Sequence, residues 1–181
     1  MMLQIQKESM MVNKLFPLVL LVGLTGCASM EPPVPENYSG ATAVIRDTVK
    51  EYSSSKSDFF SLEAIDDRKI PNSRFATRAA NQGRGFIMEP VVVERKVKAE
   101  ESTFEIVART EYAAPALALT NKVYQVKGRV HFAPVKGKSY LVKGELGDTY
   151  SSVWIEDDTT HEIVDKKIEV HGSSELGFFE K

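Results

Sequence analysis

The sequence predicts an all-β fold: a single antiparallel β-sandwich of about seven or eight strands with at most one or two short helices, after a cleaved signal peptide. Three observations predict it. From residue 41 onward, short runs alternate apolar and polar residues and are rich in Val, Ile, Phe, Tyr and Thr. Gly, Pro, Asp and Ser separate these runs at intervals of about 8 to 15 residues. The remaining length, about 140 residues, suffices for one core but not comfortably for two.

The composition excludes several classes of protein. The chain has 181 residues, with 23 Lys and Arg against 25 Asp and Glu, 43% apolar residues, three His and one Cys. A disordered chain, a collagen-like repeat, a disulfide scaffold and a strongly basic nucleic-acid binder all require other compositions. The net charge of −2 gives no general attraction to polyanions, so we expect no nucleic-acid partner.

The first element is a secretory signal. Lys14 precedes the apolar run Leu15–Thr25, which is too short to cross a hydrocarbon core that needs about 20 residues. Translation starts at either Met1 or Met11, and a start at Met11 places Lys14 near the N-terminus, where such a signal carries its cation.

The residues Leu24-Thr25-Gly26-Cys27 resemble the lipobox of bacterial lipoproteins. The resemblance implies that residues 1–26 are removed and that Cys27 is acylated and becomes the N-terminus. Three acyl chains, at about 0.8 kcal/mol per buried CH₂, make such an anchor effectively permanent. Ala28 stands where an Asp retains such proteins at the inner membrane, so the resemblance implies the outer membrane, with the domain facing the periplasm. The alternative is a buried structural Cys.

Residues 27–40 are predicted to be the acylated Cys and a tether. The segment from Ser29 to Gly40 holds three prolines and no apolar pattern. In extended form, at about 3.1 Å per residue, it would hold the domain up to roughly 35 Å from the lipid. The sandwich domain is predicted to span residues 41–181.

Eight strands are predicted from the alternating runs. They are Ala41–Thr48, Phe59–Ile65, Phe86–Val93, Thr103–Tyr112, Val123–Phe132, Tyr140–Leu146, Ser151–Glu156 and Glu162–Val170. The first is ambiguous, because Ile45, Val49 and Tyr52 also fit a helical stripe.

One short helix is predicted from Ser73 to Gln82, with Ser73 as its cap and Gly83 just beyond its end. The apolar run Tyr112–Leu119 is broken by Pro115 and is interpreted as a buried crossover on a sheet edge, with membrane contact as the alternative.

The clearest predicted pairing is a hairpin between Tyr124–Phe132 and Tyr140–Leu146. With Phe132 facing Tyr140, one face is wholly apolar and Gly128 faces Gly144. The facing glycines leave a gap that a large side chain must fill. Trp154 is the candidate, although Val153 and Ile155 compete with it for the inward face.

The other face of this hairpin places Arg129 opposite Lys143. Two like charges facing each other are mildly destabilising unless a carboxylate from a third strand or an anionic partner lies between them. The alternatives are two solvated side chains that splay apart and an anion site.

No catalytic, cofactor or metal site is predicted. The chain has no nucleophile elbow, and its three histidines, His131, His161 and His171, lack metal-ligand spacing. Each histidine is expected on the surface of a strand. The run Gly83-Arg84-Gly85 is expected to be a turn.

Two acidic segments, Asp66–Lys69 and Asp157–Thr160, are expected to be hairpin turns and not calcium loops. The charged run Glu94–Glu101 is expected to be a solvated strand end and loop; a partner-facing rim is the alternative.

Several segments together resemble a family of uncharacterised proteobacterial lipoproteins. They are Ala43–Asp47, Ser61–Asp67, Ala80–Phe86, Tyr112–Pro115 and Val153–Asp157. The resemblance implies a transthyretin- or carboxypeptidase-regulatory-like β-sandwich, a fold that serves as a binding or spacer module. Where the family has Asp-Gly in its first turn, this chain has Asp66-Asp67.

The expected function is therefore that of an outer-membrane lipoprotein that is held to the membrane by Cys27, binds an envelope protein and is not an enzyme. The alternative is an accessory lipoprotein for a small ligand or a glycan. A glycan site would use exposed aromatic side chains, for which the candidates are Tyr112, Tyr140, Tyr150 and Trp154.

Overall fold

The structure is a computed structural model that describes residues 30–181. The predicted signal peptide, the lipobox and Cys27 lie outside these residues. Within them the chain forms, in order, β1 (Thr42–Arg46), β2 (Thr48–Ser53), β3 (Lys56–Ile65), β4 (Arg68–Lys69), α1 (Ser73–Ala80), β5 (Glu94–Lys98), β6 (Ser102–Tyr112), α2 (Pro115–Thr120), β7 (Gln125–Phe132), β8 (Ser139–Glu145), β9 (Tyr150–Asp157) and β10 (Ile163–His171).

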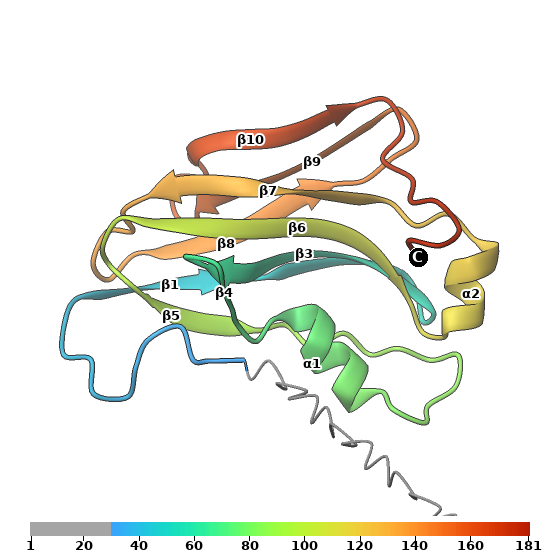
Figure 1. Ribbon diagram of the computed structural model, residues 1–181, viewed down its shortest axis with the longest axis horizontal. Helices are drawn as coiled ribbons and strands as arrows, with labels where there is room; N and C mark the ends of the chain where they lie inside the picture. The colour runs from blue at the N-terminus through green and yellow to red at the C-terminus, as the bar shows by residue number, and fades with distance from the viewer. Residues whose placement is uncertain (1–29) are drawn as a thin grey trace, which may run out of the picture.

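Two sheets pack face to face, which confirms the predicted all-β sandwich (Figure 1). The first sheet has the strand order β10-β9-β8-β1-β5. The second has the order β2-β3-β6-β7, with the short β4 paired to β3. The pairing is not wholly antiparallel, because β1 runs parallel to β8 with Ile45 opposite Tyr140.

The start of the domain is two strands and not a helix. Ile45 lies on β1 in the first sheet, whereas Val49 and Tyr52 lie on β2 in the second. The chain changes sheet at Asp47, which separates the two strands. The helical alternative for this region is therefore wrong.

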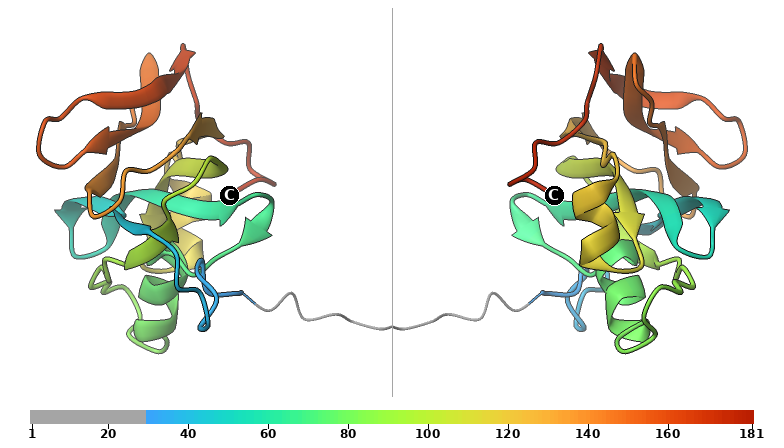
Figure 2. Two further views of the ribbon diagram at one scale, coloured as in Figure 1. Left: turned by 90° about the vertical axis from the view of Figure 1, so that its left-hand side faces the viewer. Right: turned by 90° about the vertical axis from the view of Figure 1, so that its right-hand side faces the viewer.

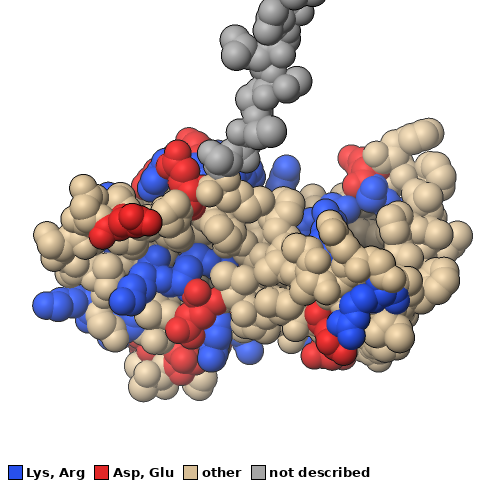
Figure 3. Space-filling view, turned by 90° about the horizontal axis from the view of Figure 1, so that it is seen from below, with Lys and Arg blue, Asp and Glu red and all other residues tan. Residues whose placement is uncertain are grey.

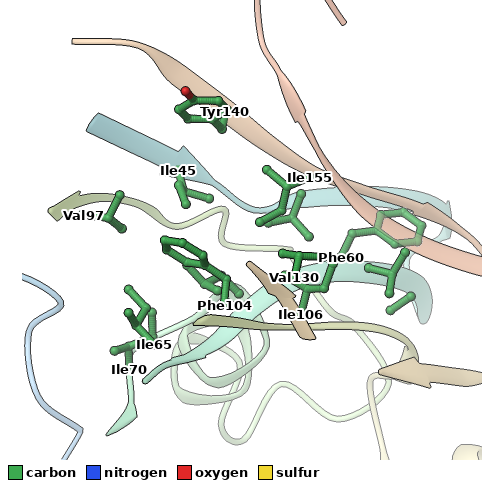
Figure 4. Packing of buried hydrophobic residues seen from close by; sticks show 14 of the residues in the cluster. Ile45, Phe60, Ile65, Ile70, Val97, Phe104, Ile106, Val130, Tyr140 and Ile155 are labelled. Carbon is green, nitrogen blue, oxygen red and sulfur yellow. The ribbon is translucent and has the colours of Figure 1, made fainter. Parts of the chain in front are cut away.

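The core lies between the sheets and takes alternate residues from each of them (Figure 4). Ile45 and Val142 from the first sheet, and Leu62, Ile106 and Val130 from the second, are fully buried. Because alternate residues of a strand face the same side, the alternating sequence pattern also indicates which residues are buried. Burying each such side chain stabilises the folded state by about 1.5 to 3 kcal/mol relative to leaving it exposed.

The predicted hairpin between residues 124–132 and 140–146 is wrong, although both strands exist. β7 pairs with β6, and β8 pairs with β9 and β1, so the two strands belong to different sheets. The connecting residues 133–138 carry the chain across the sandwich. Alternation shows that two strands share a core, but it does not distinguish strands that pair from strands that pack.

Large side chains do fill the space left by the two glycines, but Trp154 is not one of them. Ile168 of β10 packs on Gly128, with Cγ1 2.8 Å from the position that a Cβ would take. Phe60 of β3 packs on Gly144, with Cδ1 2.5 Å from the corresponding position. The neighbours of Trp154 on β9 take the inward positions and belong to the core, so Trp154 lies on the outer face.

Arg129 and Lys143 do not face each other either. Arg129 lies opposite Glu105 of β6 and donates from Nη2 to Oδ1 of Asp67 at 2.5 Å. Lys143 lies opposite Trp154 of β9. The predicted contact between like charges is therefore not formed.

The predicted strand Phe86–Val93 is wrong. These residues are irregular, and the strand begins after them with β5, which pairs with β1 at the edge of the first sheet. The backbone of the segment is tied to α1 instead, since Val91 N donates to Thr77 Oγ1 at 2.8 Å and Val93 N donates to Ser73 Oγ at 2.8 Å. The charged run Glu94–Glu101, which was expected to be a strand end and loop, thus contains the whole of β5.

The predicted helix is confirmed as α1, with a different cap. Asn72 caps it, and its side chain accepts hydrogen bonds from Arg74 N and Phe75 N at 3.1 and 3.2 Å. Gly83 follows with a φ of 80°, in the left-handed region that glycine favours.

The predicted buried crossover is wrong, because the run contains a helix with no buried residue, α2. Pro115 begins this helix instead of breaking it. Proline is tolerated in the first turn because its missing N–H has no partner there in any case.

Both predicted aspartate turns are confirmed. Asp66 and Asp67 adopt φ values of 48° and 64°, as a type I′ turn between β3 and β4 requires. Asp157 Oδ1 accepts hydrogen bonds from Thr159 N and Thr160 N at 2.9 and 3.1 Å, which closes the turn between β9 and β10.

Residues 30–40 do not extend freely from the sandwich. Glu31 N donates to the carbonyl of Lys69 on β4 at 3.4 Å, and Pro33 shares a small void of about 20 Å³ with Val97 at the end of the core. This part of the predicted tether therefore covers one end of the domain. No helix within residues 30–181 has the length and apolarity that crossing a membrane requires.

Candidate functional site

The helices α1 and α2 lie on the same side of the molecule, one above the other in the right-hand view of Figure 2. Two adjoining hollows lie between them. They share Arg78, Tyr112, Ala113 and Pro115, so we treat them as one site and call it the α1–α2 groove. The first hollow, of about 420 Å³, is also lined by Arg109, Thr110, Glu111, Ala118, Leu119, Val123 and Lys181. The second, of about 510 Å³, is also lined by Thr77, Asn81, Gln82, Gly83, Gly85, Met88 and Ala114.

Ion pairs fix α1 on the second sheet. Arg74 binds Glu63 and also donates from Nε to Glu111 Oε1 at 2.7 Å. Glu63 lies where the register of β3 against β6 shifts, between Leu62 and Ala64. Because a bulge redirects a side chain, we attribute the contact of Glu63 with the helix to this shift.

Three arginines surround the one carboxylate of the groove. Glu111 binds Arg74 of α1, Arg78 Nη2 at 2.9 Å and Arg109 Nε at 3.4 Å. The three arginines face two carboxylates, Glu111 and Glu63, so the cluster has one positive charge in excess. Arg78 is the exposed member, with 57% of its side chain accessible, and it lies where the two hollows meet.

The protonation states follow from this arrangement. Burial raises the pKa of Glu111, but Arg74 and Arg78 outweigh burial and hold the pKa below its ordinary value. Burial lowers the pKa of Arg109, although Glu111 opposes this effect. Burial also raises the pKa of Tyr112. At neutral pH Glu111 is therefore charged and Tyr112 keeps its proton.

This chemistry suits binding. Leu119, Val123 and Met88 give the groove apolar walls, while Arg78 and Arg109 bring guanidinium groups to it. A guanidinium donates paired hydrogen bonds to a carboxylate or a phosphate. The groove can thus accept a ligand that combines apolar groups with an acidic one.

This site was not predicted from the sequence. Of its lining, only Tyr112 was a candidate binding residue, and none of the arginines was. The signal that could have found them is spacing: Arg74 and Arg78 are four residues apart on the predicted helix, and Arg109 and Glu111 share a face of the predicted strand. Nothing in the sequence indicated that the helix lies on that strand.

The histidines lie apart from the groove. His131 Nδ1 is 2.9 Å from Thr103 Oγ1, and His161 Nδ1 is 3.5 Å from Glu156 Oε1. The His171 ring lies beside Tyr150, with the ring centroids 5.3 Å apart and the planes tilted by 49°. All three are exposed, as predicted, but His161 lies in the turn between β9 and β10 and not on a strand. No histidine lines the α1–α2 groove.

The four aromatic candidates do not gather into one platform. Tyr112 lines the groove, and Tyr140 is buried in the core. Tyr150 binds Glu169, and the ring of Trp154 lies under Lys167 Nζ, 4.0 Å from the ring centroid.

Comparisons of the chain with protein-family models, with curated proteins and with solved structures gave no match. In the described part of the chain, no three His, Cys, Asp or Glu residues form a cluster that could hold a metal ion.

Proposed function

We propose that this chain is an outer-membrane lipoprotein, anchored through acylated Cys27, whose sandwich is a non-enzymatic protein-binding module of the cell envelope. The α1–α2 groove is its binding surface. The partner is a protein that places an extended segment with apolar side chains and a carboxylate in the groove.

The exposed guanidinium of Arg78 between two apolar hollows carries this proposal. A single carboxylate of a partner segment placed there can bind Arg78 while its neighbours enter the hollows on either side. The lipobox supports the anchor, and the small residues Thr25 and Gly26 before Cys27 suit a signal peptidase.

The binding surface can be tested with a photo-crosslinking amino acid at Leu119 in intact envelopes. Leu119 lines the groove and is 43% exposed, so we expect a crosslink to a partner protein. Arg78→Glu should reduce the crosslink at least about tenfold, because it replaces an attraction with a repulsion. The matched control is Lys127→Glu on β7, an exposed residue outside the groove, which should leave the crosslink unchanged.

Two results would contradict the surface: no crosslink at Leu119, or a crosslink that survives Arg78→Glu. The anchor is tested separately by Cys27→Ser, which should abolish acylation and move the chain from the membrane fraction to the soluble fraction. If export, processing and fractionation stay unchanged, the anchor is wrong whatever the groove binds.

A small anionic ligand is the second candidate, because the first hollow alone, at about 420 Å³, has the size of a ligand pocket and brings Arg78 and Arg109 together. This alternative predicts no protein crosslink at Leu119. It predicts instead a small molecule of constant mass that accompanies the protein in native mass spectrometry and is lost in Arg78→Glu.

A further inference from the structure

Three segments form one face of the molecule, which we call the base. They are residues 30–40, α1 and residues 81–93, and they lie together along the lower side of the ribbon in Figure 1. Among residues 30–181, five of the eleven exposed large apolar side chains come from these segments: Met30, Phe75, Phe86, Ile87 and Val92. Figure 3 views the molecule from this side, where residues other than Lys, Arg, Asp and Glu cover the middle, with charged residues to the left and right of them.

The chain between the base and Cys27 is short. Glu31 is held to β4 by its backbone and by an ion pair with Arg68 at 3.6 Å. Only three residues lie between it and Cys27. The four steps from residue 27 to residue 31, at about 3.3 to 3.6 Å each, span at most about 14 Å. Lipid attached to Cys27 therefore lies within that distance of the base, and not at the end of a long tether.

A loop of the base presents apolar side chains without net charge. Gly83 and Gly85 adopt positive φ values of 80° and 65°, and Phe86 and Ile87 follow with 63% and 52% of their surface exposed. Arg84 makes two hydrogen bonds to the Glu89 carboxylate, at 2.7 and 3.0 Å. The charge of Arg84 is thus neutralised within the loop, so the loop suits contact with an uncharged apolar surface.

We infer that the base rests on the lipid bilayer, with Phe86 and Ile87 inserted among the headgroups and upper acyl chains. The inference rests on the proposed acylation of Cys27, which brings the bilayer to this face. Apolar side chains next to a lipid anchor add to its hold, because each one removes apolar surface from water. The domain then has a fixed orientation in which β10, on the opposite side in Figure 1, faces away from the membrane.

The test uses residues 27–181, which include both sheets and the whole core, coupled through Cys27 to a maleimide phospholipid. Cys27 is the only thiol of the chain, so the coupling is specific and supplies the anchor chemically. A failure then concerns the orientation of the domain and not its acylation in the cell, which Cys27→Ser tests. The vesicles are phosphatidylcholine, with or without bromine on the acyl chains.

A single tryptophan reports contact with the brominated chains. The reporter is Phe86→Trp and the matched control is Ile163→Trp, both made in a Trp154→Phe background. Ile163 is also exposed, at 42%, but it lies on β10. We expect brominated lipid to reduce the emission of Phe86→Trp about twofold and to leave that of Ile163→Trp unchanged.

Equal quenching of the two reporters would overturn the inference, because the domain would then have no preferred orientation. Quenching of neither reporter would overturn it as well and would assign the exposed apolar side chains of the base to a protein partner. Circular dichroism of each variant confirms that the sandwich is intact before coupling.

Discussion

Asp47 receives four hydrogen bonds although none of its surface is exposed. Arg95 donates to both carboxylate oxygens, at 2.8 and 2.6 Å, and Leu62 N and Ser73 N donate at 3.0 and 2.8 Å. This single carboxylate thus joins β5 of the first sheet to β3 of the second and to the start of α1.

Replacing Arg95 by Met should destabilise the domain by about 3 to 5 kcal/mol, because it leaves the charge of Asp47 buried without its counter-ion. Urea unfolding followed by circular dichroism measures the loss. Lys96→Met on the same strand is the control; Lys96 is exposed and should change stability by less than about 0.5 kcal/mol. Similar small losses in the two variants would show that Asp47 does not depend on Arg95.

Asp157 should make stability depend on pH in the acid range. The Lys138 ammonium, followed by Thr160 N and Thr159 N, lowers its pKa to about 2, below the value of about 3.9 in an unfolded chain. The stabilisation is therefore complete above about pH 4 and is lost as the pH falls towards 2. Asp157→Asn should lower the urea midpoint at pH 7, and the difference from the original chain should disappear near pH 2.

Asp158→Asn is the control for this experiment. Its carboxylate is 3.8 Å from Arg46 in an exposed ion pair, which contributes little. A difference between Asp157→Asn and the original chain that stays constant from pH 7 to pH 2 would contradict the role given to Asp157.

At the scale of single residues, the sequence predicted local chemistry better than distant partners. The turn role of Asp157 follows from its neighbours, because Thr159 and Thr160 are next to it in the chain. The role of Asp47 does not, because Arg95 is 48 residues away and only the pairing of β1 with β5 brings the two together. For the same reason the arginines of the α1–α2 groove could not be assigned to a common site.

At the scale of elements, Gly144 and Gly128 are positions where one strand lies unusually close to another element. Adding a methyl group to Gly144 would place it 2.5 Å from Phe60 and 2.6 Å from the backbone oxygen of Ser152. At Gly128 it would meet only the side chain of Ile168, at 2.8 Å.

Both Gly→Ala variants should destabilise the domain, by about 1 to 3 kcal/mol, with Gly144→Ala the more severe because a backbone oxygen cannot rotate away. Double-mutant cycles separate the two cases. In an Ile168→Ala background, Gly128→Ala should cost much less. In a Phe60→Ala background, Gly144→Ala should still be costly, since Ser152 remains. Equal rescue of the two variants would contradict this packing.

The positions of the strands along the chain were predicted well, but the pairing of strands within the sheets was not. Alternation identified β3, β6, β7, β8, β9 and β10, because each has one face in the core. It missed β5, because this strand is mostly charged and lacks the alternation of apolar and polar residues. Its Arg95 faces inward and binds Asp47. The predicted hairpin of residues 124–146 was wrong because two strands that pack across a core have the same pattern as two strands that pair.

At the scale of the whole molecule, the sandwich was predictable because length, alternation and turn residues all favour it. The covering of one end of the sandwich by residues 30–40 was not predictable. Residues 30–40 have the proline content of a linker, yet Pro33 lies beside Val97 and covers the end of the core. Proline indicates an extended backbone, but whether that backbone leaves the domain or lies on it depends on the surface that the rest of the fold provides.

The parallel pair of β1 and β8 constrains the order in which the first sheet can form during synthesis. Val44 pairs with Ser139, so β1 is synthesised long before the strand that it pairs with. This pair cannot form until roughly three quarters of the residues have been made. Until then β1 has an unpaired edge that can join the strands of other chains.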